Sequence, residues 1–286
     1  MCAEFGKLGL LHLMAISGFH FALVGGIFAS LLRLFFPQRA TVVLLIFLLS
    51  SYFFFLGSSP SIVRAWTMSV IAFTAFLLER KPLALNALGA SFLFILIFDP
   101  LLVNTMGFQF SAAVTASILL FYPITNSILE NFIAKRSLSK VSQMHSFDQH
   151  CYFILSVFRE AFALTLAVNI IATPLSLYYF SKFPLMSLIY NFFVPFLVSC
   201  SLFFLILSSL FYLLFPYLGL ICFSLTAHFT HFMLNFIYNA PSSMNVYWYI
   251  PNIPSLGISL YLTLAFCSGI FAKKTNQNHS QDAWLL

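Results

Sequence analysis

Long apolar segments, separated by short runs containing Pro, Gly or charge, extend along almost the whole chain. A transmembrane helix needs about 20 consecutive apolar residues, whereas a membrane β-barrel shows alternating ~10-residue segments. The uninterrupted runs therefore predict helices. We predict an all-α, polytopic helical membrane protein with about nine transmembrane helices, in a range of about seven to ten. The predicted spans lie near residues 8–31, 41–56, 61–79, 83–98, 106–126, 161–181, 185–212, 217–239 and 256–272.

The distribution of charge supports the same partition. Only 7% of the 286 residues are charged, against about 25% in soluble proteins. No Asp, Glu, Lys or Arg occurs in 183–272, a stretch long enough for about three or four spans. Four basic groups fall on one side of the membrane, which predicts an outside N-terminus and a cytoplasmic C-terminus. These groups are Arg33 with Arg39, Arg80 with Lys81, the four basic residues of 127–160, and Lys273 with Lys274.

The partition predicts one transmembrane domain over residues 1–272, with a long polar loop at 127–160 and a short cytoplasmic tail at 273–286. We expect the first apolar stretch to remain in the mature protein, because Glu4 stands where a signal peptide has its basic region. The segment 241–255 is rich in Pro, Tyr and Trp. Such residues favour the membrane interface, so we predict an interfacial or re-entrant segment there.

Ionisable residues inside a membrane are costly and mark functional candidates. His12, Ser17 and His20 fall within one sector of a helix, about 140° wide. Gly18 allows close backbone approach or a break at this point. Two interpretations stay open: the histidines face a cavity, or they hydrogen-bond across helices and hold the bundle together.

Further polar residues stand where predicted spans begin or end. Arg64 follows the segment 57–61, whose Gly, Ser and Pro residues predict a helix N-terminus. Its guanidinium either snorkels to the interface or forms a fixed cation at the mouth of an anion path. We interpret Asp99 as a loop or cap residue, and Gln109 and Ser111 as polar groups that enter the next span.

Two prolines lie inside predicted spans. Pro174 removes a helical hydrogen bond, so the carbonyl that it frees must find a donor in a neighbour or in a water-lined cavity. Pro195 follows Asn191 and predicts a kink. His228 and His231 lie on one helix face, but two imidazoles alone do not make a zinc site. The five cysteines have no metal-type spacing, so we predict no metal and no other cofactor.

Taken in order, several of these motifs resemble the competence domain of ComEC-type DNA-uptake channels. Residues 12–20 (HLMAISGFH) are similar to that family's H-L-L-A-I-S-G-L-H signature, and residues 57–65 match its G-x-x-P-S-x-x-R-A. Asp99-Pro100, the block GFQFS at 107–111 and Asn191 ahead of Pro195 follow in the same order. The matches cover residues 5–210, which is most of the chain.

The resemblance implies a channel core, not an enzyme, that passes single-stranded DNA across the cytoplasmic (inner) membrane during natural transformation. It implies membrane lipids, DNA-receptor proteins and a cytoplasmic motor as partners, and leaves a homo-oligomer open. Family members resemble larger proteins with an OB-like and often a metallo-β-lactamase-like domain, which this sequence lacks. We therefore expect a fragment or one part of a split system. The implied path residues are His12, Ser17, His20, Arg64, Asp99, Gln109, Ser111 and Asn191.

Two other functions remain open from the residues alone. A proton-coupled secondary transporter for a small solute would use His12 and His20 as proton relays. An intramembrane hydrolase would use Ser17 as its nucleophile and His228 or His231 as its base. The segment AISG that contains Ser17 is similar to the G-x-S-G of rhomboid-type proteases, but the leading Gly is missing.

Overall fold

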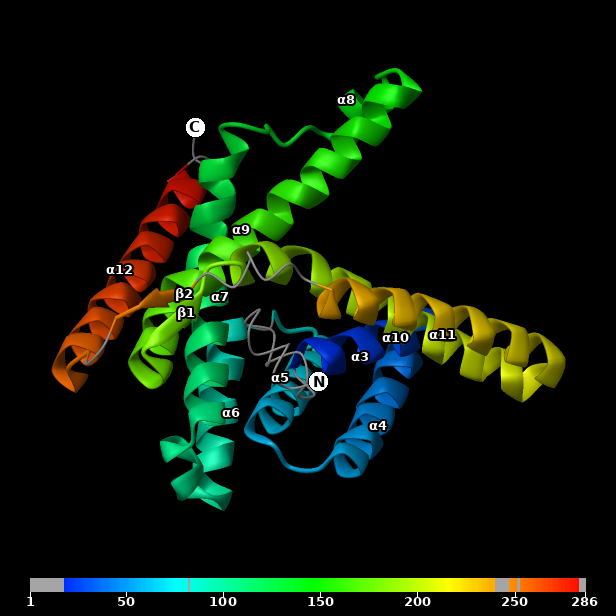
Figure 1. Cartoon of the computed structure of the whole chain (residues 1–286), viewed down its shortest axis with the longest axis horizontal. Coiled ribbons are helices and arrows are strands. Elements are labelled where there is room, and N and C mark those ends of the chain that lie inside the picture. The colour runs from blue at the N-terminus through cyan, green and yellow to red at the C-terminus, as the bar shows by residue number, and fades with distance from the viewer. Residues whose placement is uncertain (1–17, 82, 240–246, 251–252, 283–286) are drawn as a thin grey trace. The chain divides into compact units, whose positions relative to one another are not determined.

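The computed structural model describes residues 18–81, 83–239, 247–250 and 253–282, and most of these residues are helical (Figure 1). The long helices are α3 (Gly18–Leu32), α4 (Gln38–Leu56), α5 (Pro60–Leu77), α6 (Ala84–Phe98), α7 (Met106–Glu130), α9 (Ser146–Phe180), α10 (Ser187–Leu214), α11 (Pro216–Tyr238) and α12 (Ser255–Asp282). The short elements are the 3-10 helix η1 (Pro100–Asn104), the helix α8 (Leu138–Ser142) and the strands β1 (Lys182–Pro184) and β2 (Tyr247–Tyr249).

Seven of the described helices are long and apolar enough to cross a membrane, namely α4, α5, α7, α9, α10, α11 and α12. The helices α3 and α6 are shorter, with 15 residues each, and are equally apolar in character. Each predicted span corresponds to one of these helices in the described part of the chain. The predicted fold class, a polytopic all-α membrane protein, is therefore confirmed.

Some predicted boundaries are wrong. The helix α7 continues to Glu130 and α9 begins at Ser146, so the connection that we placed at 127–160 shrinks to residues 131–145 and contains α8. Residues 146–160 contain neither Pro nor Gly, so nothing stops the helix from beginning before its apolar part. For the same reason α12 continues beyond residue 272 to Asp282.

Two other predictions fall partly outside the described residues. The helix α3 continues through Gly25 and Gly26, so the predicted first span is not broken there. Residues 1–17, which precede α3, lie outside the description. The predicted interfacial segment 241–255 is described only at 247–250 and 253–255, where β2 and the start of α12 lie.

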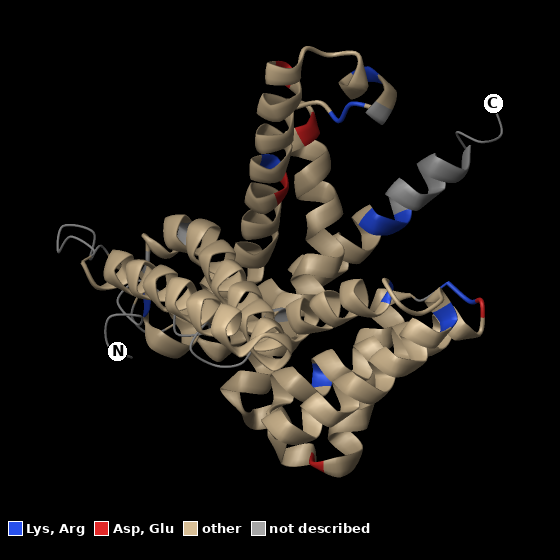
Figure 2. Ribbon diagram, turned by 90° about the vertical axis from the view of Figure 1, so that its right-hand side faces the viewer, with Lys and Arg blue, Asp and Glu red and all other residues tan. Residues whose placement is uncertain are grey.

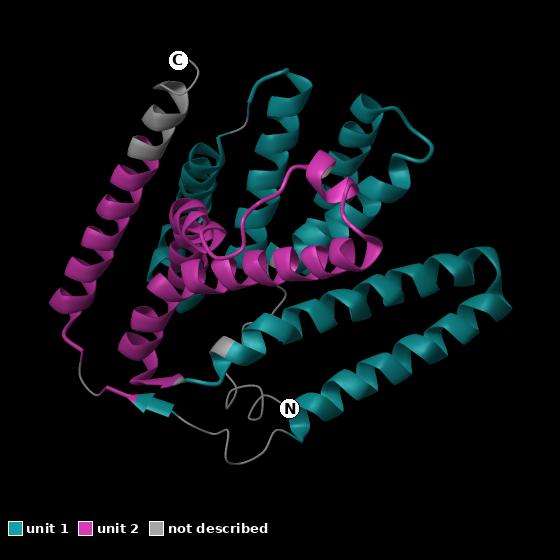
Figure 3. Cartoon of the chain, turned by 90° about the horizontal axis from the view of Figure 1, so that it is seen from above, with its two compact units in different colours: residues 1–108, 184–248 teal, residues 109–183, 249–286 magenta. Residues whose placement is uncertain are grey.

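The chain forms two compact units (Figure 3). Unit 1 comprises residues 1–108 and 184–248, and unit 2 comprises residues 109–183 and 249–286. The strands β1 and β2 pair as a two-stranded sheet, and each strand stands where the chain passes from one unit to the other. The single domain that we expected over residues 1–272 stays a prediction.

In unit 1 the helices α3, α4 and α5 pack around the buried side chains of Phe21, Leu49 and Ile62. The Trp66 ring stacks on Phe53 with 4.8 Å between the centroids. Its indole N–H also donates to a serine hydroxyl of α4 at 3.0 Å. Such a polar contact between membrane helices adds to van der Waals packing, because apolar side chains alone gain little by leaving lipid.

The helices α10 and α11 form a hairpin in unit 1. Hydroxyls join them twice, Ser201 to Thr230 at 2.7 Å and Ser208 to Thr226 at 2.9 Å. Near the turn, a Cβ added at Gly219 would lie 2.2 Å from the Cα of Tyr212. Only glycine therefore permits this close approach of the two helices.

In unit 2 the helix α9 presents small side chains to α7. Ala163 and Ala167 are fully buried one turn apart on α9, and hydroxyls of α7 donate to their carbonyls. Ser117 donates to the Ala167 carbonyl at 2.5 Å, and Thr125 to the Ala163 carbonyl at 2.9 Å. Small residues let the backbones approach, which brings these hydroxyls within hydrogen-bonding distance.

Charged residues occupy few places on the structure. Figure 2 shows long helical stretches without Lys, Arg, Asp or Glu, as expected for segments surrounded by lipid. Arg39, at the start of α4, pairs with Glu79 just after α5. Arg33, Arg80 and Lys81 lie in the α3–α4 and α5–α6 connections of unit 1, and the placement of the basic groups on one side of the membrane stays a prediction.

Candidate functional site

The first two sequence motifs meet where α3 and α5 begin. A Cβ added at Gly18 would lie 2.9 Å from Nη2 of Arg64 and 3.4 Å from the Cβ of Ala65. Since the glycine has no side chain, the Arg64 guanidinium lies directly against the α3 backbone. Gly18 and Arg64 are 46 positions apart in the sequence. Their contact therefore brings the two motifs together within unit 1.

The residues before Arg64 explain why its side chain lies at this contact. Pro60 occupies the first turn of α5, where its missing N–H costs nothing, and Ser59 precedes it in an extended conformation. Arg64 follows about one turn later and is only partly exposed. It stands at the helix end nearest to the α4–α5 connection, which places a cation at one boundary of an otherwise uncharged helix.

His20 and Asn191 lie on two helices of unit 1 that also contact each other. His20 is partly buried on α3, and Asn191 is partly buried near the start of α10. The helix α3 contacts α4, α5 and α10, so it joins the helices that carry Arg64 and Asn191. Of the predicted residues, the structure thus brings His20, Arg64 and Asn191 onto one connected set of helices.

A polar pair on α10 includes Ser187, which is not among the residues predicted from the sequence. The Oδ1 atom of Asn191 and the Oγ atom of Ser187 are buried and have no hydrogen-bond partner among the described residues. Residues four apart lie on the same face of a helix. Buried polar atoms without a protein partner are rare and indicate a water or ligand site. The signal that was missed is the spacing of Ser187 from Asn191.

Asp99 serves as a helix cap, as predicted. It is exposed, and its carboxylate accepts the Leu101 N–H at 3.1 Å at the start of η1. Gln109 and Ser111 lie in the first turns of α7 in unit 2. Gln109 accepts a hydrogen bond from the Tyr179 hydroxyl near the end of α9. His12 and Ser17 lie outside the described residues.

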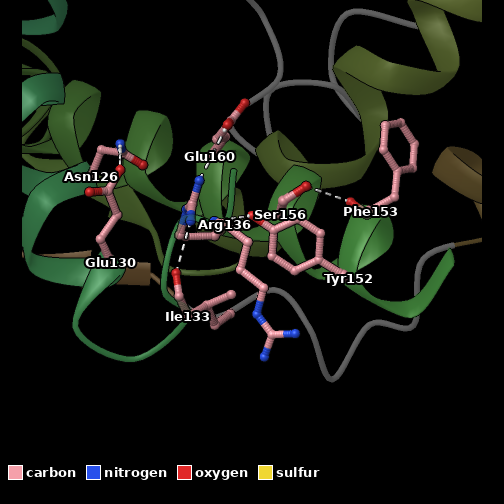
Figure 4. A network of polar contacts seen from close by, with 9 residues as sticks. Asn126, Glu130, Ile133, Arg136, Tyr152, Phe153, Ser156 and Glu160 are labelled. Atoms are coloured by element: carbon pink, nitrogen blue, oxygen red, sulfur yellow. Dashed lines mark hydrogen bonds and ion pairs between the residues drawn. The ribbon is translucent and has the colours of Figure 1, made fainter. Parts of the chain in front are cut away.

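The connection between α7 and α9 contains a second polar cluster (Figure 4). Arg159 of α9 is only 4% exposed and donates to the Ile133 carbonyl at 2.8 Å. It also contacts the Glu160 carboxylate at 3.4 Å. A buried arginine is costly unless it is paired, so this contact holds the start of the connection against α9. In the sequence, Arg159 is only one of the four basic residues of 127–160.

Arg136 is held in the same connection. Its backbone N–H donates to the Tyr152 hydroxyl at 2.8 Å, and its guanidinium carbon lies 5.6 Å from the centre of the Tyr152 ring. Its Nη1 atom also lies 3.3 Å from the Met144 sulfur. These contacts order a basic residue of the connection instead of leaving it extended in solvent.

Both prolines within the helices of unit 2 free a carbonyl that α12 engages. Pro174 cannot bond the carbonyl of Ile170 four residues earlier, and Tyr261 donates its hydroxyl to that oxygen at 2.8 Å. Pro123 leaves the Leu119 carbonyl in the same way, and Lys273 donates to it at 3.4 Å. Of the two expectations for the carbonyl freed by Pro174, a donor from a neighbour or a water-lined cavity, the structure shows the neighbour.

The two histidines of α11 are both exposed. The Nδ1 atom of His228 lies 2.7 Å from the Ser224 carbonyl, and that of His231 lies 3.1 Å from the Asn235 amide nitrogen. Within the residues that the structure covers, no three or more His, Cys, Asp or Glu side chains gather in a way that could hold a metal ion.

Comparison with known proteins identifies relatives of the chain. A family model described as Competence protein matches residues 1–275. The chain is 28% identical over 198 residues to ComE operon protein 3 of Bacillus subtilis (strain 168). This match covers 68% of the chain but only 22% of the relative. The chain therefore corresponds to a small part of that protein's length. No solved structure matches the chain.

Proposed function

Because the chain belongs to the Competence protein family, we propose that it forms the membrane core of a channel that passes single-stranded DNA inward across the cytoplasmic membrane during natural transformation. The contact between Gly18 and Arg64 carries this proposal. It joins the two most distinctive motifs of the chain and fixes a cation at the boundary of an apolar bundle.

The charge of the site suits a phosphate backbone. A fixed cation attracts phosphates, and Arg64 lies among helices that carry no other Lys or Arg between residues 40 and 79. A strand must also leave the path, so strong binding along its whole length would stop passage. Uncharged polar groups such as those of Ser187 and Asn191 offer hydrogen bonds without that strong attraction.

We propose that the chain transports without catalysing a reaction. The sequence has no Walker A loop, so the energy for movement comes from a partner or a gradient. The partners that fit this role are a DNA receptor outside the membrane and a motor protein in the cytoplasm. The proposal covers the membrane passage alone, because the match covers 22% of the relative.

The test measures entry of labelled DNA into the cytosol of a competent bacterium that lacks its own channel. The strain carries the chain alone or fused to OB-like and metallo-β-lactamase-like domains. We expect entry with the fusion at least. If the inserted protein gives no entry in either form, the proposal is wrong and the solute-transporter hypothesis takes its place.

Matched glycine variants test the contact between Gly18 and Arg64, on which the proposal rests. In Gly18→Ala the new methyl group displaces the Arg64 guanidinium, because its Cβ would lie 2.9 Å from Nη2. The end of a flexible side chain can move, so we expect the protein to stay inserted while DNA entry falls. Gly26→Ala is the control, since no atom lies within 4 Å of its Cβ position. Equal entry in both variants would remove Arg64 from the path.

Arg64 itself is tested by charge and by shape. Arg64→Gln removes the cation and should reduce DNA entry strongly. Arg64→Lys keeps the charge but loses the planar group that lies against Gly18, and should retain part of the entry. If the Gln and Lys variants are equally impaired at equal protein level, geometry and not charge is the property that matters.

A further inference from the structure

The connection between α7 and α9, residues 131–145, carries cations that lack a carboxylate partner. It contains no Asp or Glu and three basic residues, all of them exposed, namely Lys135, Arg136 and Lys140. Arg39 and Arg159 each lie against a glutamate. Within the described ranges, no ion pair joins the three cations of the connection to a carboxylate. The connection therefore presents unneutralised positive charge to an outside partner.

The carboxylates that flank the connection have roles within the protein. Glu130, at the end of α7, accepts a hydrogen bond from the Asn126 amide at 2.9 Å. Asp148 lies in the first turn of α9, where a negative charge suits the helix dipole. One of the cations is also held in place, since the Arg136 guanidinium carbon lies 5.6 Å from the centre of the Tyr152 ring (Figure 4). The connection is thus an ordered surface with positive charge.

The helix α9 carries this surface beyond the lipid. After Arg159 and Glu160, the helix has no charged residue up to its end at Phe180, which gives one membrane span of about 20 residues. Ser146, the first residue of α9, lies 13 residues before Arg159, or about 20 Å further along the helix axis. The headgroup layer is only about 5–8 Å thick. The start of α9 and the connection before it therefore lie in water.

Two phenylalanines are exposed on this part of α9. Phe147 is 70% exposed and Phe153 is 67% exposed, and both precede Arg159, which stands at the end of the membrane span. Aromatic rings in water are unfavourable unless another surface covers them, and lipid tails do not reach this far. An unpaired nucleobase provides such a cover, because every base has a flat face that stacks on an aromatic ring. The rings therefore favour a partner with unpaired bases.

Cations and exposed rings together are the elements of a surface for single-stranded nucleic acid. We propose that the α7–α9 connection and the first turns of α9 hold the DNA strand, with Lys135, Arg136 and Lys140 on its phosphates and Phe147 and Phe153 on its bases. That the strand is DNA rests on the proposed function. The predicted topology places the connection in the cytoplasm, so this surface receives the strand as it leaves the membrane.

The first test measures how salt affects binding. The full chain is purified in nanodiscs of phosphatidylcholine, and binding of a short fluorescent oligodeoxythymidylate is followed by anisotropy at several KCl concentrations. Each contact between a lysine and a phosphate steepens the plot of log K against log salt by about 0.7. Lys135→Gln and Lys140→Gln should each flatten the plot by this amount. Lys81→Gln is the matched control, because Lys81 is an exposed cation of the α5–α6 connection, and it should leave the slope unchanged.

The second test measures stacking. A base that stacks on an aromatic ring contributes a factor of about five to about 160 in affinity. Phe147→Ala and Phe153→Ala should each weaken binding of the oligonucleotide within this range. Paired bases cannot stack on a side chain, so the same variants should bind a DNA duplex as the parent protein does. Phe55→Ala is the control, since Phe55 is 86% exposed near the end of α4 in unit 1.

Three results would overturn the proposal. A salt dependence that Lys135→Gln and Lys140→Gln leave unchanged shows that the phosphates bind elsewhere, and a parent chain that does not bind the oligonucleotide has the same consequence. An affinity for the single strand that neither phenylalanine variant lowers shows that no base stacks here. Displacement of the oligonucleotide by dihexanoyl-phosphatidylglycerol at low concentration assigns the surface to lipid headgroups. Binding is measured without transport, so each of these results leaves the proposed function to be decided by DNA entry.

Discussion

Removal of the Tyr261 hydroxyl tests how the proline-interrupted helix α9 is stabilised. In Tyr261→Phe the ring remains and only the donor to the Ile170 carbonyl is lost. Because Pro174 has no N–H, no backbone donor replaces it. The carbonyl then stays without a partner in the half-buried region between α9 and α12 of unit 2.

The expected cost is about 1 kcal/mol. Leaving a buried acceptor without a partner costs about 1–3 kcal/mol in soluble proteins. Interhelical hydrogen bonds in bilayers average about 0.6 kcal/mol and reach about 1.7 kcal/mol. Tyr261 is 42% exposed in this chain, which favours the lower part of the combined range.

A double-mutant cycle with Pro174→Ala isolates this term. Alanine restores an N–H that donates to the Ile170 carbonyl within α9, so the Tyr261 hydroxyl becomes dispensable. Tyr261→Phe should then cost close to zero in the Pro174→Ala protein, and the coupling free energy should be about 1 kcal/mol. The assay is unfolding in mixed detergent micelles, measured for all four proteins under the same conditions.

Tyr217→Phe is the matched control, because Tyr217 is 88% exposed on α11. It should leave the free energy of unfolding within about 0.5 kcal/mol of the parent protein. The reasoning fails if Tyr261→Phe costs the same in the parent protein and in the Pro174→Ala protein. It also fails if Tyr261→Phe has no effect in the parent protein.

Further changes test the helix contacts. Gly269→Ala should lower the free energy of unfolding by about 1–3 kcal/mol, because its Cβ would lie 3.1 Å from the Leu120 Cβ. Gly107→Ala, with no atom within 4 Å, should be neutral or stabilising by up to about 1 kcal/mol. Ser208→Ala removes the donor to or acceptor from Thr226 and should cost about 0.6–1.7 kcal/mol, measured in the same micelles. Gly219→Ala should prevent the α10–α11 hairpin from closing, which protease cleavage near the turn would report and an intact, resistant turn would contradict.

The amino-acid sequence predicted most of the fold because a membrane span is a local property. Length and apolar composition decide whether a segment crosses lipid, and these are read directly from the chain. The boundaries near residues 127–160 were less predictable. Polar residues suggested a loop there, but a helix continues through polar residues wherever Pro and Gly are absent, as α7 and α9 do.

The candidate site was predictable as a set of motifs and not as an arrangement. Gly18 and Arg64 were both selected from the sequence, but their contact depends on how α3 packs on α5. Ser187 was missed because a serine in an apolar span is no signal by itself, and only its spacing of four residues from Asn191 sets it apart. That the Ser187 hydroxyl has no hydrogen-bond partner within the described part of the chain became visible only once the side chains around α10 were placed.

The order of residues alone establishes that the chain is a helical membrane protein, and that Pro174 must leave a carbonyl in need of a donor. Both follow from chemistry within a few residues. The packing of α12 on α9 is what makes Tyr261 the donor, 91 residues further along the chain. The same holds for α11, whose histidines were evident but whose outward face was not. Which side of a helix is buried depends on the helix that packs against it, and that packing joins residues far apart in the sequence.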